Sequence, residues 1–456
     1  MREQLAIWLG RGAGMLSRWL GRGGGTTVPG VVARRIAPNL LRYLSAQLPR
    51  GVILVAGTNG KTTTTRMVAD ILTHAGWRIV HNRSGANLVS GVSAVMLANA
   101  DWRGHMHHDA ALLECDEAAL PQIIHETQPR IVVLHNLFRD QLDRYGEVDT
   151  IAQHWLTALS TLPDSTVVCI QGDDPSLARL AQSLTCRVVV YGNNDVSSAR
   201  NSVAHLADAG FCRCGYALTY TTRFFAHIGH YTCPNCDFRR PALDYAITTL
   251  RADGLLGSTV TVNQHAQFFV PLPGSYNAVN ALAAYAVADV LGVATAVVPA
   301  LTQMQPAFGR YEVVHTPHHP LVMALIKNPV GASETIRMFV EAWDQPANLL
   351  IVINDRDADG TDVSWLWDAD FEHLVPHINH VFISGTRAAD MRVRMQYAGT
   401  STAQIHYHES LTQALDALLT QTPSGQTVSV LPTYTAMLDL REILVGRDWV
   451  KPFWQD

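Results

Sequence analysis

The feature that most constrains the fold is a short apolar segment that leads directly into a loop rich in glycine and threonine. Val52–Ala56 predicts a buried strand, and the apolar residues after the loop recur at helical spacing. The loop between them reads Gly57-Thr58-Asn59-Gly60-Lys61-Thr62-Thr63. In this strand–loop–helix order the glycines let backbone N–H groups surround a phosphate, and the helix N-terminus adds partial positive charge. The segment therefore predicts an α/β fold with a phosphate-binding loop.

Two side chains of the loop have roles that follow from their chemistry. Lys61 would reach the β- and γ-phosphates of a nucleotide, and the Thr62 hydroxyl would ligate Mg²⁺. The loop departs from the strict Gly-x-x-x-x-Gly-Lys-[Ser/Thr] pattern, because Val55 occupies the place of the first glycine. A threonine-rich helix start with a chance Gly-Lys is the alternative interpretation. The apolar strand before the loop and the apolar helix after it favour the phosphate site.

Length, charge and cysteine content limit the class of protein. A chain of 456 residues predicts two or three domains. The formal net charge is −5, and a nucleic-acid partner is not expected, since it would need clustered Lys and Arg. The sequence shows neither an apolar run long enough for a transmembrane helix nor a signal peptide. Seven cysteines in such a chain predict reduced thiols and a cytoplasmic location.

Alternating strand-like and helix-like segments predict two α/β units with parallel sheets. We expect a central nucleotide-binding domain over residues 46–312 and a second, Rossmann-like domain over residues 313–456. The junction is expected near Gly309–Pro320, where Pro317 and Pro320 should interrupt any regular element.

Residues 1–45 form a separate N-terminal segment in which apolar side chains alternate with arginines. Such a helix could lie on a membrane surface or dock on its own domain. Gly10, Gly12 and Gly14 weaken a free helix, which favours docking.

Four of the cysteines lie in a stretch without helical periodicity, about residues 207–241, which predicts an insertion. Cys212-x-Cys214 and Cys233-x-x-Cys236 are separated by eighteen residues. A tetrahedral structural Zn²⁺ requires paired thiolates on two tight turns, and these two pairs provide them. We therefore predict a zinc ribbon; four unrelated cysteines or two disulfides are the alternatives.

The phosphate loop and several later segments resemble the Mur ligases and folylpolyglutamate synthases. The loop has the form Gly-Thr-Asn-Gly-Lys-Thr, and Glu114 ends a strand at the place of the family's Mg²⁺-binding glutamate. Gly274–Ala281 resembles the adenine-side motif, in which Asn277 would contact the nucleotide, and Arg310 lies in a segment like the one that closes the central domain. The resemblance implies ATP and Mg²⁺ as cofactors and an acyl-phosphate reaction. It also implies a Mur-ligase-type central ATPase domain.

Residues 136–146 resemble a further family motif, Asn-x-x-x-Asp-His-Leu-Asp-Arg-x-Gly, with one departure. Gln141 stands where the family has a histidine that helps to hold a second metal ion. An amide oxygen can ligate a hard cation, but more weakly than the usual ligands. The second metal site is therefore not predicted from this segment.

An aspartate-rich loop follows a strand in the second domain, where α/β proteins place ligand sites. It holds four acidic residues within 355–362, and Trp365 and Trp367 are expected to be buried and to anchor its end. A metal site, a catalytic carboxylate and a solvated loop would each explain it.

Together with Lys327-Asn328-Pro329 and the four cysteines, this loop makes the chain similar to the MurT family, the ligase subunits of bacterial lipid II isoglutaminyl synthases. The resemblance implies ATP-dependent amidation of the D-glutamate α-carboxylate of the lipid II stem peptide to D-isoglutamine, at the inner face of the cell membrane. Ammonia would come from a GatD-type glutaminase subunit that contacts the C-terminal domain in a heterodimer. An amino-acid-adding ligase is the alternative activity, and an ATP-binding scaffold for a glutaminase is a third.

The same resemblance implies that an aspartate of this chain completes the catalytic group of the glutaminase. A carboxylate can orient and charge an imidazole across an interface. Asp359, beside Gly360 at the loop tip, is the first choice, and Asp355 and Asp362 are the alternatives.

Overall fold

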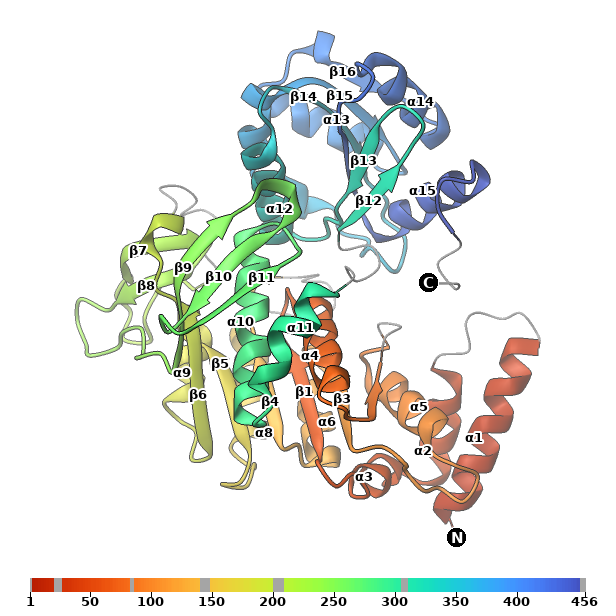
Figure 1. The fold of residues 1–456 in the computed structure, drawn as a ribbon, viewed down its shortest axis with the longest axis vertical. Helices are drawn as coiled ribbons and strands as arrows, with labels where there is room; N and C mark the ends of the chain where they lie inside the picture. The colour runs from red at the N-terminus through yellow and green to blue at the C-terminus, as the bar shows by residue number, and fades with distance from the viewer. Residues whose placement is uncertain are drawn as a thin grey trace.

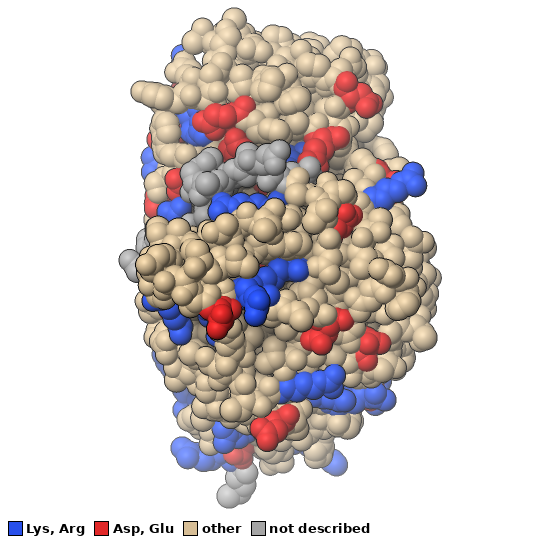
Figure 2. Space-filling model, turned by 90° about the vertical axis from the view of Figure 1, so that its left-hand side faces the viewer, with Lys and Arg blue, Asp and Glu red and all other residues tan. Residues whose placement is uncertain are grey.

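The computed structural model describes residues 2–19, 27–82, 86–139, 148–199, 209–304 and 311–451. Three parts follow one another along the chain (Figure 1): a group of N-terminal helices, a large sheet covered by helices, and a second sheet with its own helices. On the face shown in Figure 2, basic and acidic side chains are interspersed.

The N-terminal helices α1 (Arg2–Trp19), α2 (Val28–Ile36) and α3 (Leu40–Ser45) pack on the large domain through α5 (Val89–Asn99). Ala6, Ile7 and Gly10 are buried in this contact. A Cβ at Gly10 would lie 2.7 Å from Leu97 and 2.9 Å from Ala33, so the glycine permits close approach of the helices. The N-terminal segment therefore packs on its own domain in this structure. In the described part of the chain, no helix is both long and apolar enough to cross a membrane.

The large sheet has nine strands in the order β11-β10-β9-β6-β5-β4-β1-β3-β2. Strands β1 to β6 and β9 are all parallel to one another. At one edge of the sheet, β10 pairs antiparallel with β9 and with β11. The strands are β1 (Val52–Ala56), β2 (Ile79–His81), β3 (Ala110–Glu114), β4 (Ile131–Leu134), β5 (Val167–Gln171), β6 (Arg187–Asn193), β9 (Tyr245–Ala252), β10 (Ser258–Val262) and β11 (Ala266–Val270).

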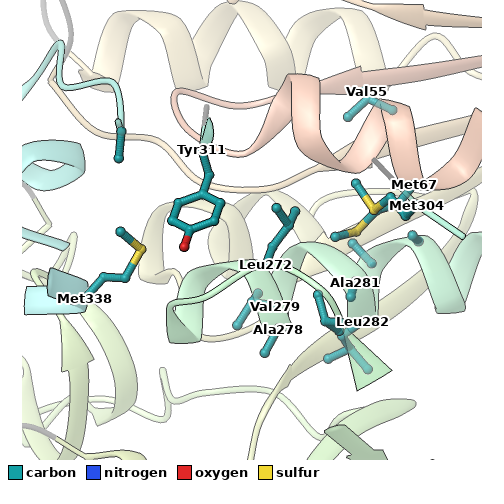
Figure 3. Close-up of a cluster of buried hydrophobic side chains, with 14 of the residues drawn as sticks. Val55, Met67, Leu272, Ala278, Val279, Ala281, Leu282, Met304, Tyr311 and Met338 are labelled. Atoms are coloured by element: carbon teal, nitrogen blue, oxygen red, sulfur yellow. The ribbon is translucent and has the colours of Figure 1, made fainter. Parts of the chain in front are cut away.

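Alternate side chains of the strands face two separate cores, as the period of a strand requires. Ile53 and Val55 of β1 face the core formed with α4 (Lys61–His74), α10 (Ser275–Val290) and α11 (Val297–Thr302). Figure 3 shows Met67 and Met304 beside Ala281 and Leu282 in this core. The opposite core contains Leu54 and the helices α6 (Leu120–Thr127), α8 (Val148–Leu159) and α9 (Pro175–Ala181).

The insertion forms a small separate sheet of β7 (Thr219–Phe225) and β8 (Ile228–Thr232). Short 3₁₀ helices occupy Val196–Ser198, Gly254–Leu256, Ala294–Ala296, Ser364–Trp367, Phe371–His377 and Thr402–Gln404.

The second domain contains a six-stranded sheet in the order β12-β13-β17-β14-β15-β16. Its strands are β12 (Glu312–His315), β13 (Pro320–Met323), β14 (Ala347–Val352), β15 (Ile378–Ser384), β16 (Ile405–Tyr407) and β17 (Val428–Pro432). Its helices are α12 (Pro329–Ala342), α13 (Ala388–Tyr397), α14 (Leu411–Gln421) and α15 (Tyr434–Gly446).

One expectation about the junction is wrong. Pro320 does not interrupt regular structure but begins β13, which pairs antiparallel with β12. A proline is tolerated as the first residue of a strand, because its missing N–H removes no ladder bond there.

Candidate active site

A cavity lies at the carboxyl end of the large sheet, where the phosphate loop faces the second domain. The space between the atoms that line it, including the part open to solvent, is about 920 Å³. The loop contributes Asn59, Gly60, Thr62 and Thr63 to the lining. The rest comes from residues at the ends of β4 and β5, from α10, from residues 325–335 of the second domain, and from Phe225, Leu272 and Tyr311. The cavity is therefore closed by both domains.

The geometry of the phosphate loop requires glycine at two positions. Gly60 has φ of +87° immediately before α4, and a Cβ there would lie 2.3 Å from Asn280 Oδ1. A Cβ on Gly57 would lie 2.9 Å from the Cβ of His135. Asn136 fixes the loop from the adjacent strand, because Asn59 N donates to Asn136 Oδ1 (2.8 Å) and Asn136 Nδ2 donates to Asn59 O (3.1 Å). The loop is thus held in shape by the protein itself.

Lys61 lies at the start of α4, as predicted, and its ammonium group is buried. Its Nζ lies 2.8 Å from Glu117 Oε1 and donates to Gly57 O (2.5 Å). Glu117 follows the turn after β3 and is also buried. We did not single out Glu117 from the sequence, although the acidic run Glu114-Cys115-Asp116-Glu117 was a visible signal.

Glu114 ends β3, the strand beside β1, and pairs in register with Val55. Its backbone is fixed by Asn82, with Glu114 N donating to Asn82 Oδ1 (2.8 Å), and its Oε1 lies 3.4 Å from Asn87 Nδ2. A carboxylate at this strand end and the Thr62 hydroxyl are hard oxygen ligands of the type that Mg²⁺ takes.

Asn277 lies in the first turn of α10 and lines the cavity, as the predicted adenine-side contact requires. Its Nδ2 donates to Pro273 O (2.7 Å), and its Oδ1 accepts from Asn280 Nδ2 (3.2 Å). Arg310 and Gln141 lie outside the described residues. The neighbouring Tyr311 does line the cavity, and Figure 3 shows it beside Leu272.

The two domains are joined at the cavity by a pair of amide side chains. Asn328 Nδ2 donates to Asn59 Oδ1 (3.0 Å), and Asn328 Oδ1 accepts from Gly331 N (2.8 Å) at the start of α12. Asn328 therefore contacts the phosphate loop while it caps a helix of the second domain.

The three candidate aspartates of the second domain lie in different environments. Asp359 is buried and accepts from Thr435 N (2.7 Å) and Thr435 Oγ1 (2.5 Å) at the start of α15. Asp355 is half-buried, and the Thr386 hydroxyl and the Arg387 guanidinium lower its pKa. Asp362 is exposed and accepts from Ser364 N (2.8 Å). The described lining of the nucleotide cavity includes none of the three.

The expected burial of Trp367 is wrong. Its side chain is 52% exposed and makes an edge contact with Tyr397, which is 76% exposed, at 5.4 Å between ring centroids. Trp365 packs partly buried against the core and is the residue that anchors the loop. Two aromatic rings thus lie at the surface close to Asp362 in the sequence.

The four cysteines of the insertion come together. Their sulfur atoms all lie within 4.8 Å of one another, with Cys212 and Cys236 at 3.6 Å and Cys214 and Cys233 at 3.4 Å. All four are free thiols, which excludes the two-disulfide alternative in this structure. A tetrahedron with Zn–S bonds of 2.3 Å has sulfurs about 3.8 Å apart, so the cluster could hold a metal ion.

Two solved structures with a similar fold are structures of ligases. The chain matches a pseudomurein peptide ligase type C from Methanothermus fervidus with a TM-score of 0.67 and 16% identity, over 89% of this chain and 80% of that one. It also matches MurF ligase from Thermotoga maritima in complex with ADP, with a TM-score of 0.64 and 12% identity over 91% and 85%. These likenesses show that the chain has the Mur-ligase fold.

Family models and relatives narrow this class. Residues 55–217 match the Mur ligase middle domain, and residues 325–437 match the MurT ligase C-terminal domain. Subunit MurT of a lipid II isoglutaminyl synthase (glutamine-hydrolyzing) from Streptococcus pneumoniae is 33% identical over 94% of each chain, and its Staphylococcus aureus counterpart is 29% identical over 97% and 98%. The chain belongs to the MurT family.

Proposed function

We propose that this ligase amidates the α-carboxylate of the D-glutamate in the lipid II stem peptide, giving D-isoglutamine. The terminal phosphoryl group of ATP passes to a carboxylate oxygen, and ADP leaves. The nitrogen lone pair of ammonia then attacks the acyl carbon, phosphate leaves, and the nitrogen loses a proton. The observation that carries this proposal is a complete phosphate loop closed by a MurT-type second domain.

Side chains in the cavity and beside it would have different parts in this reaction. Lys61 neutralises the charge that builds up on the transferring phosphate. Thr62 and Glu114 would hold Mg²⁺, which supplies further positive charge to the phosphates. Asn277 and Tyr311 line the part of the cavity beyond the loop, where the nucleoside would be held.

The ammonia would come from a partner glutaminase; the relatives are named as subunits of a glutamine-hydrolyzing synthase, which supports this source. The exposed rings of Trp367 and Tyr397 support a docking surface on the second domain, because aromatic residues are enriched in interfaces. The adjacent loop offers carboxylates to a partner histidine. Asp362 is exposed, whereas Asp355 would have to release Thr386 and Arg387, and Asp359 would have to release Thr435.

Work at the inner face of the membrane is supported by α1. Leu5, Trp8, Leu9 and Met15 form one exposed apolar face of this helix, each about half exposed. Trp102 lies beside it, since Trp8 Nε1 donates to Trp102 O (2.7 Å) and Arg11 lies over the Trp102 ring. Tryptophan and arginine around an apolar helix face are typical of an interfacial segment.

The insertion would bind a structural Zn²⁺ through Cys212, Cys214, Cys233 and Cys236. With all four positions filled by thiolates, the ion would have no open position for catalysis. It would instead fix the two turns beside the β7–β8 hairpin.

The function is tested with the purified chain, its glutaminase partner, lipid II, ATP and glutamine. The expected products are phosphate and amidated lipid II. Free ammonia should support the same reaction when both the glutaminase partner and glutamine are left out. Lys61→Ala should lower the rate by at least about a hundredfold, whereas Arg66→Ala, on an outer face of the same helix, should not. Incorporation of an amino acid but not of ammonia would instead support an amino-acid-adding ligase.

A further inference from the structure

Three residues form a row across the floor of the nucleotide cavity. Leu134 of β4 pairs in register with Ala56 of β1 on one side and with Ile170 of β5 on the other. The residues at the ends of these strands, Gly57, His135 and Gln171, are therefore neighbours. Adjacent strands lie about 4.8 Å apart, so the row leads from the phosphate loop to His135 and then to Gln171. Both side chains line the cavity, and each residue is only 1% exposed.

The tautomer of His135 is assigned from its contact with Tyr191. The Tyr191 hydroxyl donates its single hydrogen to Leu134 O (3.0 Å), and its oxygen lies 3.0 Å from His135 Nδ1. With the hydroxyl hydrogen assigned to Leu134 O, the Tyr191 oxygen is the acceptor, and Nδ1 carries the ring hydrogen and donates it to that oxygen. Burial and the nearby Lys61 charge lower the pKa of His135 to about 3, so the ring is neutral. Its Nε2 is consequently a hydrogen-bond acceptor.

Two buried polar atoms of this row have no protein partner. Among the described residues, His135 Nε2 and Gln171 Nε2 are enclosed and make no hydrogen bond. Leaving such groups unsatisfied costs free energy, which indicates a ligand that pairs with them. The nearby amides are already engaged, since Asn136 bonds the loop backbone and Asn277 bonds Pro273 and Asn280. An acceptor and a donor therefore remain side by side on the floor.

We propose that His135 and Gln171 select the base of the nucleotide. His135 Nε2 accepts from the exocyclic amino group of a 6-aminopurine, and the Gln171 amide donates to the adjacent ring nitrogen. The apolar side chains of Leu272, Val279 and Phe225 line the same cavity and suit the flat faces of a purine. This inference rests on the proposed use of ATP and adds the residues that distinguish adenine from other bases.

A 6-oxopurine presents the opposite pattern. Its carbonyl oxygen would face the lone pair of His135 Nε2, and its ring N–H would face the Gln171 donor. The Gln171 amide can turn over, but the imidazole cannot change its tautomer while Tyr191 accepts from Nδ1. His135 is thus the discriminating residue, and Tyr191 is a positioning residue that acts through it.

The test compares the dissociation constants of MgATP, inosine triphosphate and purine riboside triphosphate for the full chain. In the wild-type chain, ATP should bind at least about tenfold more tightly than the other two. His135→Leu should bring the three values within about threefold of one another, and the control His265→Leu, at an exposed position, should leave them unchanged. In Tyr191→Phe, His135 can carry its hydrogen on either ring nitrogen, so the variant should bind inosine triphosphate better relative to ATP than the wild type does.

An ATP preference that survives in His135→Leu would overturn the inference. A second outcome would also overturn it: His135→Leu keeps its preference for adenine but no longer distinguishes ATP from 2′-deoxy-ATP. That result would place His135 at the ribose. The proposed amidation fails separately: a wild-type chain that binds ATP selectively but forms no amide contradicts the function and leaves the base selection standing.

Discussion

The ammonium of Lys61 lies 2.8 Å from the carboxylate of Glu117, and both side chains are buried. A buried charge needs a partner, because removing one member of such a pair leaves the other uncompensated. In this structure Glu117 supplies the negative charge beside the lysine that the reaction requires. A phosphate in the loop would supply negative charge at the same ammonium.

Glu117→Gln should destabilise the nucleotide-free protein by about 1–3 kcal/mol, since a neutral amide replaces the charged partner of Lys61. MgATP should recover most of this loss by bringing phosphate charge to the ammonium. Thermal denaturation with and without MgATP measures both effects. Asp70→Asn is the matched control, because the Arg66–Asp70 pair on α4 is partly exposed and should contribute little. If Glu117→Gln were destabilised equally with and without MgATP, Glu117 would have only a structural role.

One zinc ion per chain should co-purify with the protein, and Cys233→Ser should lose it. The four sulfurs are close enough for a tetrahedral site, and three thiolates bind zinc much less tightly than four. Metal analysis by mass spectrometry counts the ion. Cys186→Ser, at a buried cysteine outside the cluster, should keep its zinc. A metal-free wild-type protein that folds normally would contradict the prediction.

Asp359→Asn should lower stability by about 1–2 kcal/mol, because its carboxylate bonds Thr435 at the N-terminus of α15. Asp355→Asn and Asp362→Asn should change stability less. Glutaminase activity of the complex then separates the roles: a loss in Asp355→Asn or Asp362→Asn without destabilisation identifies the carboxylate that serves the partner. A loss in Asp359→Asn with unchanged melting would assign that role to Asp359.

Leu5→Glu combined with Leu9→Glu should lower binding to vesicles of anionic phospholipid by at least about tenfold, since each leucine loses its favourable transfer into the interface. Both side chains are 49% exposed, so the fold should persist. Vesicle co-sedimentation measures the change. Val298→Glu places the same charge at an exposed valine on α11 and should bind as the wild type does. Unchanged binding of the double variant would exclude this face of α1.

The sequence was sufficient where one short segment determines its own structure. The alternation of Ile53 and Val55 with Leu54, and the glycines that precede Lys61, are local signals, so the strand, loop and helix could be predicted. The clustering of the four cysteines followed from ligand spacing in the same way.

Contacts between distant segments could not be predicted. Glu117 is 56 residues from Lys61, and Asn328 is 269 residues from Asn59. Parallel strands gather their carboxyl ends at one edge whatever their distance in the sequence, so the row from Gly57 to Gln171 becomes visible only once the strand order is known. The exposure of Trp367 was equally hidden, because an aromatic residue in a sequence indicates burial more often than a surface.

The amide contact between Asn59 and Asn328 also bears on inhibitor design. The phosphate loop alone is a poor target for a selective drug, because many unrelated enzymes bind the same triphosphate. Here the cavity wall passes from the Mur ligase middle domain to residues 325–335, which belong to the MurT C-terminal domain. A compound that contacts both Asn59 and the lining residues of 325–335 would touch a surface made by both modules, and its selectivity would come from that combination.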